Sequence, residues 1–277
     1  MQKRHPLATL ALYATAIATC VILLFPIYWM IVTALQPSTN LRAYPPQFWP
    51  ADPQWGVFMS ILEEHPFLRW FLNSLQIAIA VMIMSLTVSV LAAYALSRFR
   101  LRGGQALGLF ILTSKMLPAT LMIIPLFAIF RSTGLVGSLW SVVIAQATLI
   151  VPFCTWMLKG YFDTIPPELE HAALVDGCSP LGTIFRIVLP VAAPGLAATA
   201  LYSFVVSWSD FLFGRTFLTT TEDNWTLQMG IAALKGEFVT EWNLIMAGSL
   251  MSSIPIIIVF LFLERFLVGG LSAGSEK

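Results

Sequence analysis

Residues 71–97 read FLNSLQIAIAVMIMSLTVSVLAAYALS, a segment without a single charged side chain. The hydrocarbon core of a bilayer is about 30 Å thick, so a helix that rises about 1.5 Å per residue needs about 20 residues to cross it. Membrane barrels use segments of about 10 residues with alternating polarity instead. This long, continuously apolar stretch therefore predicts a transmembrane helix.

Five further segments of similar length and composition predict five more spans. The whole chain agrees, because 58% of its 277 residues are hydrophobic and only 10% are charged, against roughly 25% charged residues in an average soluble domain. We predict an all-α integral membrane protein in which residues 1–277 form a single transmembrane domain. The six predicted spans cover residues 7–35, 71–97, 107–130, 135–158, 187–209 and 242–263.

The placement of lysine and arginine predicts the orientation, because cytoplasmic segments carry an excess of both. With both termini in the cytoplasm, nine of these residues lie inside and five outside. The short segment 98–102, RFRLR, contributes most to this bias. The inside set is Lys3, Arg4, Arg98, Arg100, Arg102, Lys159, Arg186, Arg265 and Lys277, and the outside set is Arg42, Arg69, Arg131, Arg215 and Lys235.

Several function classes lack the residues that they need. The net charge of +1 and the absence of an arginine-rich tract argue against nucleic acid as a partner. The three cysteines have no metal-ligand spacing, and no HExxH motif or paired acidic cluster is present. A phosphate-binding GxxxxGK[ST] loop is also missing. We therefore expect no catalytic residues, no metal and no cofactor.

The predicted cytoplasmic loop 163–190 contains a short helix with marked ends. Pro167 suits a first helical turn, Glu168 and Glu170 complement the positive helix end, and Gly177 suits the left-handed position after the last turn. From the residues alone, a docking helix and an ordinary surface helix are equally good interpretations. One stripe of this helix, at i, i+3, i+4 and i+7, consists of Leu169, Ala172, Ala173 and Asp176.

The motif Glu170-His171-Ala172-Ala173, with Gly177 and then Ile187-Val188-Leu189-Pro190 at fixed spacing, resembles the EAA loop of binding-protein-dependent ABC importers. Trp208-Ser209-Asp210-Phe211 and the tail from Val268 to Gly274 resemble the same family. The resemblance covers essentially the whole chain. It is narrowest to the six-span second permease of maltose-type carbohydrate importers.

This resemblance implies a type I ABC importer permease fold and a set of partners. These are a second permease subunit in a heterodimer, two cytoplasmic ABC ATPase subunits and an extracytoplasmic solute-binding protein, in a cell (inner) membrane. The loop helix would couple ATP hydrolysis by the ATPases to transport of a sugar, oligosaccharide, polyol or glycoside. The implied coupling residues are Glu170, His171, Ala172, Ala173, Asp176 and Gly177.

One position departs from the motif. The family usually has glutamate directly before the two alanines, where this chain has His171, and Glu170 lies one residue earlier. Either Glu170 takes over the charged contact with the ATPase, or His171 forms a hydrogen bond in its place.

Three residues are candidates for the translocation path: Lys115, Trp208 and Asp210. Lys115 lies inside a span, where a charge costs about 2.5–3.5 kcal/mol on insertion scales; it could face the path, pack against protein or extend toward the cytoplasmic surface. An acidic group beside an indole, as in Asp210 and Trp208, could bind sugar hydroxyls or cap the span. A self-sufficient secondary transporter is the alternative function, but no acidic residue or internal repeat was found in the spans.

Two further segments have alternative interpretations. Residues 225–234 predict a short helix outside the membrane, which either meets the solute-binding protein, as in the resembled family, or lies on the lipid surface. The tail from Val268 to Lys277 either reaches between the two ATPase subunits or is a frayed terminus.

Overall fold

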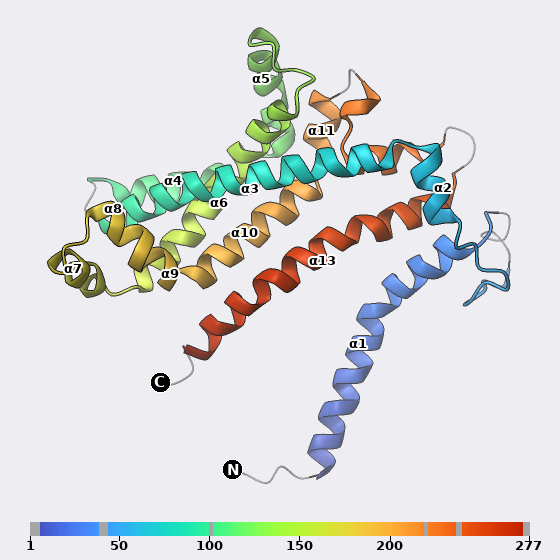
Figure 1. Ribbon diagram of the computed structural model, residues 1–277, viewed down its shortest axis with the longest axis horizontal. Helices are drawn as coiled ribbons and strands as arrows, with labels where there is room; N and C mark the ends of the chain where they lie inside the picture. The colour runs from blue at the N-terminus through green and yellow to red at the C-terminus, as the bar shows by residue number, and fades with distance from the viewer. Residues whose placement is uncertain (1–5, 39–43, 100–101, 219–220, 237–239, 274–277) are drawn as a thin grey trace. The chain divides into compact units, whose positions relative to one another are not determined.

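The computed structural model describes residues 6–38, 44–99, 102–218, 221–236 and 240–273. These residues form helices joined by short connections, without a strand; one isolated bridge pairs Lys235 with Thr240. The all-α prediction is confirmed. In chain order, the elements are α1 (Pro6–Leu35), α2 (Val57–Glu64), α3 (Phe67–Arg98), α4 (Gly104–Ser114), α5 (Ala119–Ser132), α6 (Leu139–Thr164), α7 (Pro167–Val175), α8 (Pro180–Thr183), the π-helix η1 (Ile184–Val188), α9 (Leu189–Val191), α10 (Ala193–Trp208), α11 (Leu212–Phe217), the 3₁₀-helix η2 (Glu222–Asn224), α12 (Leu227–Ala233) and α13 (Trp242–Ala273) (Figure 1).

Four of these helices are long and apolar enough to cross a bilayer by themselves, and their apolar windows lie in Thr9–Leu35, Phe67–Arg98, Leu139–Thr164 and Trp242–Leu267. Two more predicted spans are each a bent pair of helices. Ala106–Ser114 meets Ala119–Ser132 at 90°, and Pro180–Val191 meets Ala193–Trp208 at 80°. The described residues therefore contain four spans, or up to six if each pair counts as one, and the number six stays a prediction.

Proline lies close to both bends. Pro118 occupies the N-cap of α5 with an extended ψ of 131°, and Lys115, three residues earlier, is the C-cap of α4. Pro190 and Pro194 flank Ala192, where α9 gives way to α10. A proline lacks the N–H that continues the helical ladder and crowds the preceding turn, so a break here is expected. The sequence predicted one span over residues 107–130 and did not predict the right angle within it.

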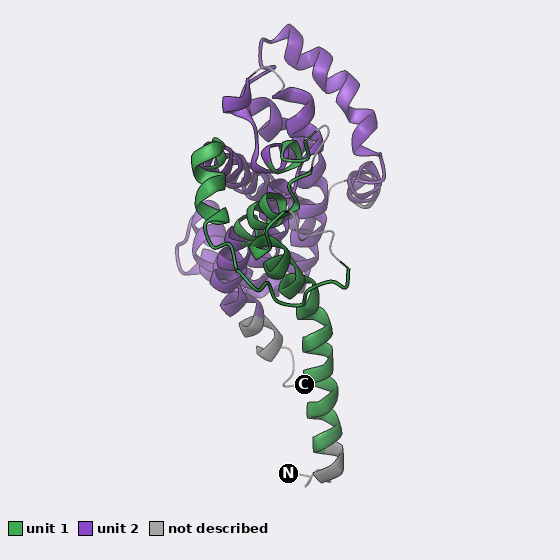
Figure 2. Ribbon diagram, turned by 90° about the vertical axis from the view of Figure 1, so that its right-hand side faces the viewer, with its two compact units in different colours: residues 1–67, 231–253 green, residues 68–230, 254–277 purple. Residues whose placement is uncertain are grey.

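The chain forms two compact units, coloured separately in Figure 2. Unit 1 comprises residues 1–67 and 231–253, and it includes α1, α2 and the first part of α13. Gly248 lets α13 pack closely here, since a Cβ at this position would meet Ile61, Ile231 and Phe67 at 3.1–3.3 Å. The prediction of a single domain spanning residues 1–277 stays a prediction.

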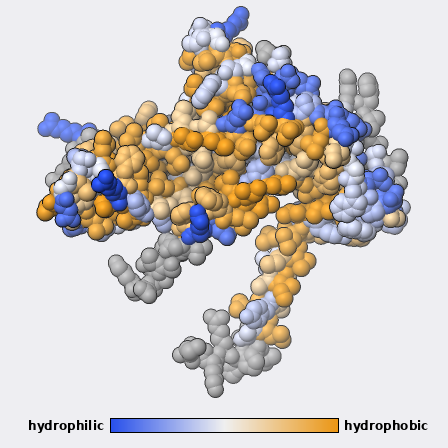
Figure 3. Space-filling model, viewed as in Figure 1, coloured by the Kyte–Doolittle hydropathy of each residue, from blue (hydrophilic) through white to orange (hydrophobic). Residues whose placement is uncertain are grey.

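The long helix α1 is apolar and almost uncovered. None of its hydrophobic window is buried inside the protein, and most of its described surface is coloured hydrophobic in Figure 3. Leu10, Ile22 and Leu23 each expose more than two thirds of their surface. Such a surface requires lipid or another apolar protein surface around it.

Unit 2 comprises residues 68–230 and 254–277 and contains two apolar clusters. The larger cluster joins α3, α5, α6 and α11 around Val81, Phe130, Val142 and Phe217. The smaller one joins the end of α6 to the segment after α7 through Leu158, Phe162, Val188 and Ala192, with Ala93 from α3. This smaller cluster also contains Ile165, the residue before the N-cap of α7.

The predicted helix outside the spans is present. Residues 227–233 form α12, and Gly230 lies directly against the indole of Trp70, so that a Cβ at Gly230 would fall 1.9 Å from a ring carbon. Trp70 is only 1% exposed and stacks on Trp225, with ring centroids 6.2 Å apart. Glycine is therefore required at position 230 by close packing.

The substitution Gly230→Ala should destabilise the protein, because the buried indole of Trp70 has no room to move aside. Overpacking of this kind costs about 1–3 kcal/mol. The measurement is the thermal midpoint of the purified chain in detergent. Gly160→Ala is the matched control: Gly160 is an exposed helical residue of α6 with nothing within 4 Å of an added Cβ, so this variant should melt at or slightly above the original midpoint. Equal midpoints for the two variants would contradict the packing argument.

Candidate functional site

The helix α7 has the ends that its sequence predicts. Pro166 is the N-cap and Pro167 the first helical residue. At the other end, Gly177 has a φ of +87°, its N–H bonds the carbonyl of Leu174 at 3.1 Å, and the N–H of Cys178 bonds the carbonyl of Ala173 at 2.9 Å. These two bonds form a Schellman motif, which satisfies carbonyls at the helix end. The predicted helix and its left-handed glycine are confirmed.

Glu170 points away from solvent and into a polar contact with the end of α3. Its residue surface is 7% exposed. One carboxylate oxygen forms an ion pair with Nε of Arg98, and the other accepts a hydrogen bond from the Tyr94 hydroxyl at 2.8 Å. Charge-assisted bonds of this kind are among the stronger ones in proteins. The carboxylate is thus already satisfied within the chain.

The same end of α3 also holds the end of α6. The guanidinium of Arg98 donates a second bond, 3.0 Å long, to the carbonyl of Ile165, the residue that follows α6. The carboxylate of Asp163 accepts bonds from Ser97 at 2.7 Å and from Lys159 at 2.6 Å. We call Tyr94, Ser97, Arg98, Asp163 and Glu170 the Arg98 cluster. It fixes both helices that flank the junction between α6 and α7.

The other face of α7 is exposed and partly apolar. Val175 is 87% exposed, Leu174 45% and Leu169 43%. His171 and Asp176 are exposed beside them. Ala173, by contrast, is 5% exposed and faces the protein together with Glu170. The predicted stripe is therefore divided: Leu169, Ala172 and Asp176 are accessible to a partner, and Ala173 packs inward.

Lys115 faces the protein interior rather than open space. Its ammonium donates a 3.1 Å hydrogen bond to the carbonyl of Leu149 in α6 and lies 5.8 Å from the centre of the Tyr202 ring. The lysine is also the C-cap of α4, at the 90° bend. These contacts favour the packing role among the roles that the sequence left open, because the charge has an acceptor on a neighbouring helix.

Trp208 and Asp210 are occupied by local packing. Trp208 is 1% exposed, stacks on Phe204 and meets Phe71 edge to face. The carboxylate of Asp210 accepts backbone N–H bonds from Gly214 at 3.1 Å and Phe213 at 3.4 Å. Burial raises the pKa of Asp210 above its ordinary value, while these N–H donors act in the opposite direction. Asp210 thus caps the start of α11, and not the end of the span α10 as the sequence interpretation had it.

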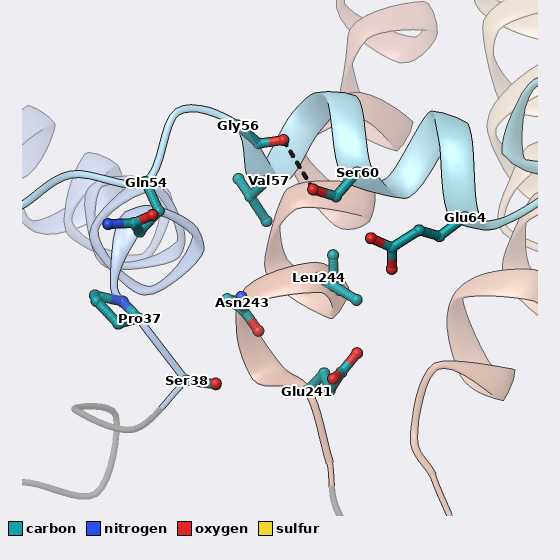
Figure 4. A pocket seen from close by; sticks show the side chains of 10 residues that line it. All are labelled: Pro37, Ser38, Gln54, Gly56, Val57, Ser60, Glu64, Glu241, Asn243 and Leu244. Atoms are coloured by element: carbon teal, nitrogen blue, oxygen red, sulfur yellow. Dashed lines mark hydrogen bonds between the residues drawn. The ribbon is translucent and has the colours of Figure 1, made fainter.

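A polar cavity of about 380 Å³ lies within unit 1 (Figure 4). The carboxylates of Glu64, at the end of α2, and Glu241, the residue before α13, both point toward it. Asn243 lines the same cavity, and the Ser60 hydroxyl is hydrogen-bonded to the Gly56 carbonyl at 3.2 Å. Among the described residues, no group of three or more metal-binding side chains comes together here or elsewhere.

The family model described as "Binding-protein-dependent transport system inner membrane component" matches residues 85–272 of this chain, which include the Arg98 cluster and α7. The chain belongs to this family. The permease is 34% identical to the inner membrane ABC transporter permease protein YcjP of Escherichia coli K12, over 99% of each chain. It is 32% identical to the sulfoquinovosyl glycerol transport system permease protein SmoH of Agrobacterium fabrum, over 92% of this chain and 89% of that protein.

A solved structure has the same fold as the permease. One chain of a bacterial ABC transporter involved in import of the acidic polysaccharide alginate superposes with a TM-score of 0.77, covering 96% of this chain and 98% of that one at 22% identity. The predicted ABC importer permease fold is thus confirmed. The curated relatives include permeases of carbohydrate uptake systems, such as the diacetylchitobiose permease DasC of Streptomyces coelicolor, 30% identical over 95% of each chain.

Sequence reasoning missed the role of Arg98 and Tyr94. Arg98 was counted only as one charge among those that determine orientation. A local signal was present, since Tyr94 and Arg98 are four residues apart and so lie on one face of a helix that ends there. Their partner Glu170 is 72 residues away from Arg98, a separation at which no local pattern identifies a contact.

The substitution Glu170→Gln should loosen α7, because it leaves the guanidinium of Arg98 without its counter-charge in a largely buried site. Removing one partner of a buried ion pair costs up to about 3–5 kcal/mol. The measurement is amide hydrogen exchange of residues 167–177, which should become faster. Glu168→Gln on the exposed side of the same helix is the control and should leave exchange unchanged. Equal exchange in both variants would show that the pair does not hold α7.

Proposed function

We propose that this permease is one of two membrane subunits of an ATP-driven importer of a carbohydrate or related polyol. The observation that supports the proposal is the division of α7 into two faces. One face is bound to α3 through Glu170, and the other presents Leu169, Leu174 and Val175 to solvent. An exposed apolar surface on a firmly attached helix suits a protein partner.

The partner of this surface is a cytoplasmic ABC ATPase. No phosphate-binding GxxxxGK[ST] loop occurs in the sequence, so the energy of ATP has to come from another polypeptide. Closure of the ATPase around nucleotide would move α7, and the Arg98 cluster would pass this movement on to the bundle. In this proposal Gly177, Ala172, His171 and Asp176 shape the docking surface, and Ala173 and Glu170 attach the helix to the bundle.

The departure from the family motif then has a physical consequence. Glu170 is engaged by Arg98 and Tyr94, so it is not available for a charged contact with the ATPase. His171 is exposed at the position where the family usually has glutamate. We propose that the imidazole of His171 supplies a hydrogen bond to the ATPase in place of a salt bridge.

The proposal includes further partners, which fit the family, and an orientation, which is argued from the placement of lysine and arginine. The further partners are a second permease subunit, a second copy of the ATPase, and a solute-binding protein on the opposite side of the membrane. Both termini, α7 and the Arg98 cluster lie in the cytoplasm. The proposed tail contact with the ATPases concerns residues whose last part, 274–277, lies outside the described range.

The substitution Val175→Asp should prevent docking, because it places a charge in the centre of an apolar contact while it leaves the inward face of α7 intact. We expect the ATPase to be lost from the complex purified in mild detergent, together with ATP-driven uptake. Val175→Thr keeps the shape of valine and should retain both. An ATPase that co-purifies equally with the two variants would show that this surface is not its docking site.

Gly177→Val should uncouple transport by straining the end of α7. A Cβ at this position meets nothing within 4 Å, so the effect would arise from the φ of +87° alone. The left-handed conformation costs an ordinary residue about 1–2 kcal/mol, whereas asparagine tolerates it better. Uptake by complexes reconstituted in vesicles should therefore fall for Gly177→Val and be largely kept for Gly177→Asn. Normal uptake by the valine variant would contradict the role of a rigid helix end.

A further inference from the structure

Most of the polar contacts that tie α3 to distant parts of the chain lie near its two ends; between them, the hydroxyl of Ser89 donates one bond to the carbonyl of Val151 at 3.2 Å. At one end is the Arg98 cluster, which binds α7. At the other end, the amide of Asn73 donates to the carbonyls of Asp223 at 2.8 Å and Trp225 at 3.0 Å. Arg69 adds a 3.1 Å bond to Asp223, and the hydroxyl of Ser74 accepts the Leu227 N–H at 2.8 Å. We call Arg69, Asn73 and Ser74 the Asn73 cluster.

Both clusters lie in unit 2. Glu170 in one and Asn73 with Ser74 in the other are buried, whereas Asp163 and Arg69 are exposed at the margins. Asn73 is 8% exposed and Ser74 4%. Their partners are backbone groups of residues 223–227, so these bonds fix the course of the loop rather than a single side chain. Asn224 adds a bond to the carbonyl of Gly137 at 3.0 Å. The start of α12 is thereby held firmly against the end of α3.

Between the clusters, α3 is an unbroken rod. Twenty-five residues separate Asn73 from Arg98, or roughly 38 Å at about 1.5 Å per residue, which exceeds the hydrocarbon thickness of about 30 Å. The sequence of α3 contains neither proline nor glycine. The other described spans contain Pro26, Pro125, Pro152, Pro194 or Pro255, and two of them are bent by 80° or more.

The helices that adjoin α7 in the chain are less rigid connections. On the N-terminal side of α7, α6 contains Pro152. On the C-terminal side of α7, the chain passes through a π-helical turn at Ile184–Val188 and the 80° bend at Ala192 before α10 begins. Prolines and π-turns are sites where helices bend. A displacement of α7 would be absorbed at these points, whereas α3 offers no such point.

We propose that α3 is a strut that transmits displacement of α7 to the loop of residues 222–230 on the opposite side of the membrane, and back again. Arg98 and Asn73 are the positioning residues at its two ends. This inference rests on the proposed function, in which the ATPase meets α7 and the solute-binding protein meets the opposite face. It assigns the connection between them to one helix and two clusters.

The test uses the complete complex in nanodiscs, with hydrogen exchange followed by mass spectrometry. A non-hydrolysable ATP analogue is added, and exchange is measured at residues 167–177 and at residues 222–230. In the unaltered complex, the analogue should change exchange in both segments. The second readout is the stimulation of ATP hydrolysis by the solute-binding protein.

The first variant softens the rod and leaves both clusters intact. Thr87 and Val88 are exposed residues in the middle of α3, and replacing both by glycine makes the helix easier to bend. The response at 167–177 should persist, while the response at 222–230 and the stimulation should each fall about fivefold or more, the lower end of typical coupling between sites. Thr87→Ala with Val88→Ala is the matched control and should behave like the unaltered complex.

The second variant releases the far end of the rod. Asn73→Ala removes the bonds to Asp223 and Trp225 and should also abolish the response at 222–230, whereas Gln76→Ala, an exposed amide on the same helix, should not. A full response at 222–230 in both the glycine pair and Asn73→Ala would overturn the strut while leaving the proposed function intact. If the unaltered complex binds no ATPase or shows no response at 167–177, the proposed function fails, and the strut fails with it.

Discussion

The burial of one carboxylate beside one guanidinium determines how the coupling region is arranged. An isolated buried charge is very costly, so Glu170 can leave water only where Arg98 and Tyr94 meet both of its oxygens. Once that face of α7 is committed to α3, the opposite face must point outward. The exposure of His171 and Val175 is therefore a consequence of the ion pair, and not a separate feature of the sequence.

The same pair makes α7 suitable for mechanical work. A helix of nine residues is too short to be stable in isolation, so its stability has to come from its ends and its attachment. Pro167 and the turn at Gly177 define the ends, and the bond from Arg98 to the carbonyl of Ile165 fixes the point where α6 stops. A partner that pushes on α7 therefore moves a body attached to two long helices, and not a loose loop.

Features that depend on residues close together in the chain could be predicted from the sequence, whereas features that depend on tertiary contacts could not. The spans and α7 depend on apolar runs, prolines and a glycine a few residues apart, and these were found. The bends of 90° and 80° were not, because a proline permits a break whereas tertiary contacts determine its angle. Asp210 and Trp208 were candidates for sugar binding, since their chemistry allows it. Their actual partners, two backbone N–H groups and two aromatic rings, depend on the local fold.

The membrane itself explains why the directional contacts of α3 are concentrated at its ends. Within the hydrocarbon core, the packing of α3 relies on side chains such as Ile77, Val81 and Ala93, and apolar contacts have no preferred direction. Hydrogen-bonding groups without partners are costly there. Directional contacts therefore carry the smallest free-energy cost near the two aqueous faces. Contacts at opposite faces can act on each other only through something stiff between them. A single helix that lacks proline and glycine, with Asn73 near one end and Arg98 at the other, meets that requirement.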